Sequence, residues 1–98
     1  MAINRPKAIS TLLVSSDRAI VTEWRFPPGA ETGWHCHEHD YVVIPMTTGT
    51  LLLEEKNGER HTDLTVGRPY IREVGVEHNV VNANSTEFVF IEVEIVAG

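Results

Sequence analysis

The sequence has little of three things: cysteine, basic charge and long apolar runs. A single cysteine, Cys36, excludes a disulfide framework within one chain and favours a reducing compartment. The formal net charge of -6 opposes nucleic-acid binding, since such a surface repels phosphate backbones. No stretch is long and apolar enough to span a membrane, and the early run AISTLLV is too short for a signal-peptide core. We therefore expect a cytoplasmic protein that binds neither nucleic acid nor membranes.

Helical periodicity is also missing. No window longer than about ten residues keeps an apolar 3.6-residue repeat without a glycine, a proline or a polar break. The apolar residues fall instead in short β-rich runs, separated by turn-forming residues. These runs cover residues 8–14, 19–26, 41–46, 50–56, 60–66, 69–74, 78–82 and 87–96. About eight short strands predict an all-β barrel or sandwich, built as one domain over residues 1–98.

Three local patterns add detail to this prediction. Asn57-Gly58 predicts a type I′ hairpin turn, because both residues tolerate a positive φ. Pro45 lies inside an apparent strand and predicts an edge or a bulge, because proline cannot donate to the ladder. The last run alternates, and we expect its aliphatic face to point into the core. That face carries Val89, Ile91, Val93 and Ile95, and the opposite face carries Phe88, Phe90, Glu92 and Glu94.

Three of the five histidines lie in GWHCHEHDYVV, residues 33–43. His35 and His37 are two residues apart, a spacing that points both imidazoles to one face of a strand. Two neutral imidazoles on one face can hold a divalent ion when a third ligand comes from a distant strand. His78, in another β-rich run, is the candidate for that ligand. A His-x-His pair also occurs as ordinary hydrogen-bonded residues, so the pair alone leaves both interpretations open.

The wider spacing around these histidines resembles the two signature motifs of the cupin superfamily, G(x)5HxH(x)3-4E(x)6G and G(x)5PxG(x)2H(x)3N. The first motif is matched at Gly29, His35 and His37. The second is matched at four of its five fixed positions, which are Gly67, Gly75, His78 and Asn82. Together the motifs span residues 29 to 82. The segment ETGWHCHEHDYVVIP also resembles small stand-alone bacterial cupins of β-alanine or amine breakdown.

The resemblance implies a cupin-type jelly-roll β-barrel, a homodimer and a metal held by His35, His37 and His78. Family cupins add the Glu of the first motif, but here Tyr41 occupies that position. A neutral phenol binds hard cations poorly, so the implied site has three neutral imidazoles and open positions. One divalent transition metal that favours imidazole (Fe, Ni, Cu or Zn) is then expected in preference to Mn or Mg.

Other polar residues near the motifs have plainer interpretations. We expect Cys36 to be a small packed residue that points away from the metal, and His61 to be solvated. Trp24 and Trp34 are expected to pack in the core or an interface. The acids Glu38, Asp40 and Glu73 are expected to be solvated, although Asp40 is placed to orient an imidazole.

Two residues are candidates for substrate binding. Tyr41 is placed to donate a hydrogen bond to a bound molecule. Arg25 can bind a substrate carboxylate, or equally pair with an acid such as Glu94 at a dimer contact.

Two classes of function remain open. The first is a metal-dependent enzyme on a small polar substrate, with an Fe(II)-dependent dioxygenase favoured over an isomerase or hydrolase. The second is a non-catalytic barrel that binds or senses a small ligand, or a scaffold that has lost its metal. The absence of the motif carboxylate at Tyr41 gives this second class its weight.

Overall fold

The structure is a computed structural model that describes residues 4–97, and within them it contains nine strands and no helix. The strands are β1 (Ile9–Ser15), β2 (Ala19–Phe26), β3 (His35–Cys36), β4 (Asp40–Pro45), β5 (Gly49–Glu55), β6 (Gly58–Leu64), β7 (Tyr70–Arg72), β8 (Glu77–Asn82) and β9 (Phe88–Ile95). The prediction of an all-β fold is confirmed, and each predicted run overlaps one strand. The two-residue strand β3 was not predicted. Residues 4–97 therefore include no helix that is long and apolar enough to cross a membrane.

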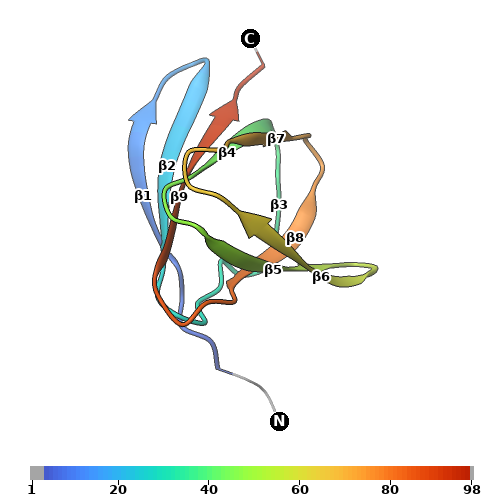
Figure 1. The fold of residues 1–98 in the computed structure, drawn as a ribbon. Coiled ribbons are helices and arrows are strands. Elements are labelled where there is room, and N and C mark those ends of the chain that lie inside the picture. Colours follow the sequence, from blue (N-terminus) through green and yellow to red (C-terminus); the bar gives the residue numbers. More distant parts are fainter. Residues whose placement is uncertain (1–3, 98) are drawn as a thin grey trace.

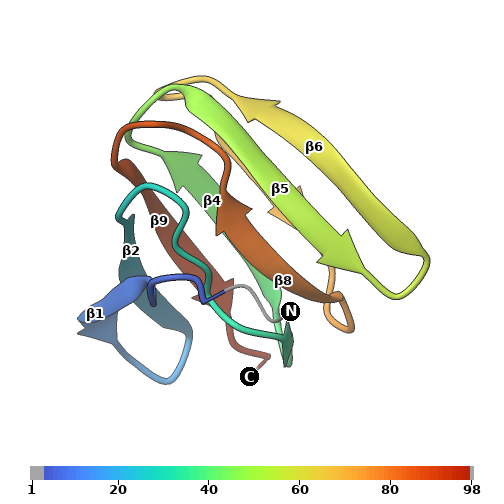
Figure 2. The ribbon, with the colours of Figure 1, turned by 90° about the horizontal axis from the view of Figure 1, so that it is seen from below.

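The strands form two antiparallel sheets that face each other. One sheet has the order β1-β2-β9-β4-β7 and the other has the order β3-β8-β5-β6. Figures 1 and 2 show the two sheets as the walls of a flattened jelly-roll barrel. Strands far apart in sequence therefore become neighbours, and β3 lies beside β8.

The core lies between the sheets and is rich in aromatic residues. Phe26 and Phe90 pack with 5.4 Å between ring centroids, and Phe88 is also buried. The expected orientation of the last strand was therefore wrong: the face of β9 with Phe88, Phe90 and Glu92 points inward. Alternation separates the two faces of a strand but does not say which one is inside. The large rings fill the space between the sheets.

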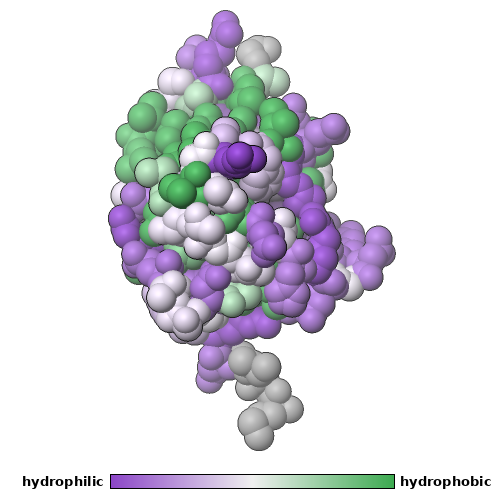
Figure 3. All heavy atoms as spheres, viewed as in Figure 1, coloured by the Kyte–Doolittle hydropathy of each residue, from purple (hydrophilic) through white to green (hydrophobic). Residues whose placement is uncertain are grey.

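The aliphatic face of β9 belongs instead to an outer row of side chains. Cross-strand pairs place Val14, Val21, Val93, Val42 and Ile71 side by side across all five strands of the larger sheet. Val14 and Ile71 are more than half exposed. We call these five residues the outer aliphatic row. Figure 3 shows hydrophobic residues gathered on the side of the molecule where β1 lies.

Two predictions of local backbone structure, one turn and one bulge, need correction. The β5–β6 hairpin forms as expected, but Glu55 pairs with Gly58, so the turn residues are Lys56 and Asn57. Only Gly58 has a positive φ, 124°, whereas a type I′ turn needs two such residues.

The predicted bulge at Pro45 is also absent. Pro45 ends β4 in regular register with Phe90, beyond the last pair with β7, so its missing N–H interrupts no ladder there.

Candidate metal centre

The three histidines singled out by the sequence lie together at one end of the barrel. His35 on β3 is the direct cross-strand partner of His78 on β8. His37 follows β3 and is held by its backbone: its N–H donates to the Val76 carbonyl at 2.8 Å, and its carbonyl accepts from the Gly75 N–H at 2.9 Å. Gly75 has a φ of 95°, a conformation that other residues rarely adopt. The turn after β7 thus fixes the second histidine, while strand pairing fixes the other two.

The spacing of the imidazole nitrogens fits one metal ion. Nε2 of His37 lies 2.9 Å from Nε2 of His35 and 3.1 Å from Nε2 of His78. Two nitrogens bound about 2.1 Å from an ion and about 90° apart would lie about 3.0 Å from each other. The three residues could therefore hold one ion between them.

Hydrogen bonding presents the nitrogen of His35 that a metal needs. Its Nδ1 lies 2.8 Å from the Gly33 carbonyl, which can only accept. Nδ1 therefore carries the proton, and Nε2 presents a lone pair. Nδ1 of His78 is buried and has no partner among residues 4–97, so its strand, rather than a hydrogen bond at that atom, orients this imidazole.

Burial keeps two of the imidazoles neutral. Burial, followed by the charges of His35 and Arg72, lowers the pKa of His37 to about 4. Burial also lowers the pKa of His78 to about 3, with smaller contributions from His35 and His37. A neutral imidazole is the form that binds metals, so both side chains are competent at neutral pH.

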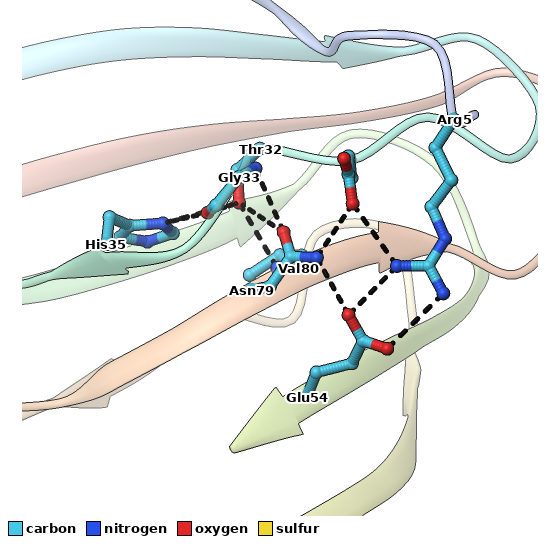
Figure 4. A network of polar contacts seen from close by, with 8 residues as sticks. Arg5, Thr32, Gly33, His35, Glu54, Asn79 and Val80 are labelled. Carbon is cyan, nitrogen blue, oxygen red and sulfur yellow. Dashed lines mark hydrogen bonds and ion pairs between the residues drawn. The ribbon is translucent and has the colours of Figure 1, made fainter. Parts of the chain in front are cut away.

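A polar network supports His35 from behind (Figure 4). The Gly33 N–H donates to Oδ1 of Asn79 at 2.9 Å, and the Gly33 carbonyl accepts from His35. The Thr32 hydroxyl lies 3.4 Å from the same Asn79 oxygen and 3.3 Å from Nδ1 of His35. The Asn79 side chain thus joins the loop that precedes β3 to β8, in addition to the hydrogen bonds between Thr32 and Val80.

The other end of this amide meets a cluster of charges. Nδ2 of Asn79 donates to Glu31 at 2.9 Å and to Glu54 at 2.8 Å, and Arg5 pairs with both carboxylates. Hydrogen bonds from Asn79 and Arg5 lower the pKa of each carboxyl group. Sequence reasoning missed this network, because only the fold brings the four residues together.

Tyr41 stacks on His37 instead of offering a carboxylate. The ring centroids are 3.7 Å apart and the planes differ by 14°. Tyr41 is buried, its hydroxyl has no partner within the described chain, and burial raises the pKa of the phenol. The phenol therefore stays protonated and is available to donate a hydrogen bond to a bound molecule.

A cavity of about 60 Å3 opens beside the histidines. Apolar residues from both sheets line its inner part, including Val43, Leu53 and Phe90. Its polar lining includes two residues that sequence reasoning did not select, Arg72 and Glu92. Burial raises the pKa of Glu92 to about 7. The cavity therefore combines a candidate metal centre, a cation and a buried acid.

Comparison with known proteins decides the family. The family model described as "Cupin domain" matches residues 22–94. The chain is a cupin.

Relatives cover nearly its whole length. Beta-alanine degradation protein BauB of Pseudomonas aeruginosa is 59% identical over 91 residues, which are 93% of this chain and 96% of BauB. A crystal structure of a cupin domain from Bordetella pertussis Tohama I is 58% identical, with a TM-score of 0.96 over 98% of this chain and 100% of that one. A double-stranded β-helix protein from Klebsiella pneumoniae, 23% identical, has a TM-score of 0.76 over 96% of this chain and 81% of its own.

Some predicted residues of this cupin lie away from the cavity. Arg25 is exposed on the outer side of β2 and pairs with Glu23 and Glu87, both at 2.9 Å. The fold therefore gives no support to its expected contact with substrate, and Arg72 is the guanidinium that lines the cavity. Asp40 accepts from the Val74 N–H at 2.8 Å and does not orient an imidazole.

The remaining predictions have mixed outcomes. Cys36 is exposed, so its expected packing was wrong. Trp34 is 50% exposed and its ring N–H donates to Glu77, whereas Trp24 is partly buried and lines the cavity. The solvated interpretation fits His61, Glu38 and Glu73, which are exposed.

Proposed function

We propose that this cupin is a metal-dependent enzyme that acts on a small polar molecule. His35, His37 and His78 would hold one divalent transition metal. The observation that carries the proposal is the convergence of their Nε2 atoms, 2.9 and 3.1 Å apart, with the lone pair of His35 fixed by the Gly33 carbonyl. Three imidazoles that offer ring nitrogens within 4.8 Å of one another are typical of a metal site.

The donor set favours Fe, Ni or Zn over Mn. All three donors are imidazoles, and the fourth family position holds a phenol that burial keeps protonated. When bound, such an ion supplies a Lewis acid, or with Fe(II) a centre for reaction with O2. An Fe(II)-dependent dioxygenase is the activity we favour, ahead of an isomerase or a hydrolase. Tyr41 would orient the substrate through its unpartnered hydroxyl.

The substrate is proposed to come from the breakdown of β-alanine or a related small amine. BauB, named for β-alanine degradation, is 59% identical to this chain over 91 residues. The cavity of about 60 Å3 fits a molecule with only a few heavy atoms. The single cysteine agrees with a role in the cytoplasm.

A homodimer is part of the proposal. The outer aliphatic row leaves Val14 and Ile71 more than half exposed, and the edge strand β1 is exposed along its whole length. A flat aliphatic row complements a second copy of itself, as a two-fold interface requires. A soluble monomer rarely leaves so many aliphatic residues on one sheet uncovered.

A second candidate function is ligand binding without a chemical reaction. The ring N–H of Trp24 and the hydroxyl of Tyr41 are buried without partners in residues 4–97, and both residues line the cavity. Such groups are stabilised by any ligand that accepts their hydrogen bonds, whether or not it reacts. A small-ligand-binding or sensing cupin is therefore the alternative.

Elemental analysis of the purified protein tests the metal centre. We expect about one transition-metal ion per chain, lost in His35→Ala and in His78→Ala but kept in the exposed control His61→Ala. Iron would direct activity screens to O2 consumption, and zinc or nickel to isomerase and hydrolase assays. A wild-type protein without metal, even after reconstitution, would refute the enzyme as stated and leave the ligand-binding alternative.

A further inference from the structure

Polar residues gather on the inner face of the larger sheet, next to the histidines. Cross-strand pairing aligns Glu94 on β9, Tyr41 on β4 and Arg72 on β7 in one row. Glu92 lies in the next row, opposite Val43. Phe26, Phe88 and Phe90 on this inner face belong to the apolar core. These polar side chains are therefore confined to the end of the barrel that carries the candidate metal centre.

One side of this group offers hydrogen-bond donors. Arg72 lines the cavity, and its ion pair with Glu55 is long, 3.7 Å. The hydroxyl of Tyr41, its direct cross-strand partner, is buried without a partner among the described residues. A guanidinium and a hydroxyl on neighbouring strands can both donate to one carboxylate.

The other side offers a buried acid. Glu92 is 8% exposed, lines the cavity and, among residues 4–97, has no hydrogen bond or ion pair that would lower its pKa. Burial, followed by the charge of Glu94, raises the pKa of Glu92 to about 7. Placing an unpaired acid here is unfavourable for folding, as expected for a group that meets its partner only when a ligand binds. An ammonium group is the partner that would favour its ionised form.

Glu92 and Arg72 stand on β9 and β7, with β4 between them, so their backbones are about 10 Å apart or slightly more. Both side chains reach into the same small cavity, which shortens the gap between their charged ends. A dicarboxylate would place a negative charge near Glu92, a diamine would place a positive charge near Arg72, and an uncharged molecule would pair with neither residue. A molecule with one carboxylate and one ammonium, a few bonds apart, satisfies both sides.

We propose that this end of the cavity recognises a small zwitterionic amino acid, with Arg72 and Tyr41 binding its carboxylate and Glu92 binding its ammonium group. The proposal rests on the function proposed above in one respect, that the molecule recognised there is the substrate beside the metal. It assigns the specificity of the site to residues outside the histidine cluster.

Calorimetric titration with three probes tests this assignment. The purified protein, with its metal content measured, is titrated with β-alanine, with propionate, which lacks the ammonium, and with ethylamine, which lacks the carboxylate. We expect β-alanine to bind about tenfold tighter or more than either fragment. Glu92→Gln should make the affinity for β-alanine equal to that for propionate. Arg72→Gln should make the affinity for β-alanine equal to that for ethylamine. The exposed controls Glu59→Gln and Arg68→Gln should leave both differences in affinity intact.

Several results would overturn the assignment. They are equal affinity for the three probes, no binding by any of them, or variants that weaken all probes alike. Thermal melting of each variant separates a loss of folding from a loss of recognition. One metal per chain without discrimination among the probes would refute only the recognition site. Discrimination by a protein that binds no metal would support that site and refute only the metal-dependent enzyme.

Discussion

The phenol ring of Tyr41 lies parallel to the imidazole of His37, with 3.7 Å between ring centroids and 14° between planes. Tyr41 occupies the position where the first cupin motif has a carboxylate. Its ring therefore packs against the side of His37, while its hydroxyl has no hydrogen-bond partner among residues 4–97. Where the motif has a carboxylate that binds the metal, this chain has an aromatic ring that stacks on His37.

Substitution of Tyr41 should separate these two roles. Tyr41→Phe keeps the stacked ring, so we expect metal affinity within about threefold of wild type and weaker binding of a carboxylate ligand. Tyr41→Ala removes the support of His37, and metal affinity should fall about tenfold or more. Metal titration against a competing chelator measures both. Equal metal affinity in the two variants would show that the stack does not hold His37.

Substitution of the two asparagines on β8, Asn79 and Asn82, should affect different properties of the protein. Asn79→Ala breaks the link between Gly33 and the acidic pair, so we expect metal affinity to fall about 10–100-fold. Asn82 donates instead to the backbone carbonyls of Phe26, Pro27 and Thr86. Asn82→Ala should lower the free energy of unfolding by about 2–4 kcal/mol and leave the metal affinity of the folded protein unchanged.

Denaturant unfolding and chelator competition, applied to both variants, test this difference. If Asn82→Ala lowers metal affinity as much as Asn79→Ala does, the network of Figure 4 has no special role in positioning His35.

The motifs allowed much of this site to be predicted from the sequence. The spacing of His35 and His37, with His78 after Gly75, selected three residues that the fold brings within reach of one ion. Strand positions followed from β-rich runs and turn residues, because both are local properties of the chain. These features need no knowledge of which strands become neighbours.

Arg72, Glu92 and Asn79 could not be found in that way. Each is an unremarkable polar residue in a short strand, and its role depends on partners from other strands. Glu92 was assigned to the wrong face because alternation is symmetrical, and the aromatic residues Phe88 and Phe90 decide the orientation only when they fill the core. A charged residue between inward-facing aromatics is the signal that would have found it.

The contribution of Glu92 to the stability of the metal-free protein should fall as pH rises, whereas the buried His37 and His78, whose pKa values are lowered, contribute the opposite pH dependence. The pKa of this carboxyl is raised from an ordinary value of 4.5 to about 7 in the folded protein, so the folded state favours its protonated form. Its stabilising contribution is complete below pH 4.5 and is lost as pH rises through 7. The loss is at most about 3 kcal/mol. Glu92→Gln, whose side chain is neutral at every pH, should not show this loss of stability.

Denaturant unfolding at pH 4.5 and pH 8 measures the difference, at one fixed protein concentration. We expect wild type and Glu92→Gln to be similar at pH 4.5, and the variant to be more stable at pH 8. The exposed control Glu59→Gln should follow wild type at both values. Parallel pH dependence in wild type and Glu92→Gln would show that the carboxyl is not held in an apolar environment.

The proposed homodimer should depend on Val93, the centre of the outer aliphatic row. Val93 pairs with Val21 on one side and Val42 on the other, so a lysine there would place a charge in the middle of the interface. We expect Val93→Lys to be monomeric in size-exclusion chromatography with light scattering, and wild type to be dimeric. His61→Lys, on an exposed position of β6, is the matched control and should stay dimeric. A dimeric Val93→Lys protein would place the interface elsewhere, and a monomeric wild type would exclude the homodimer.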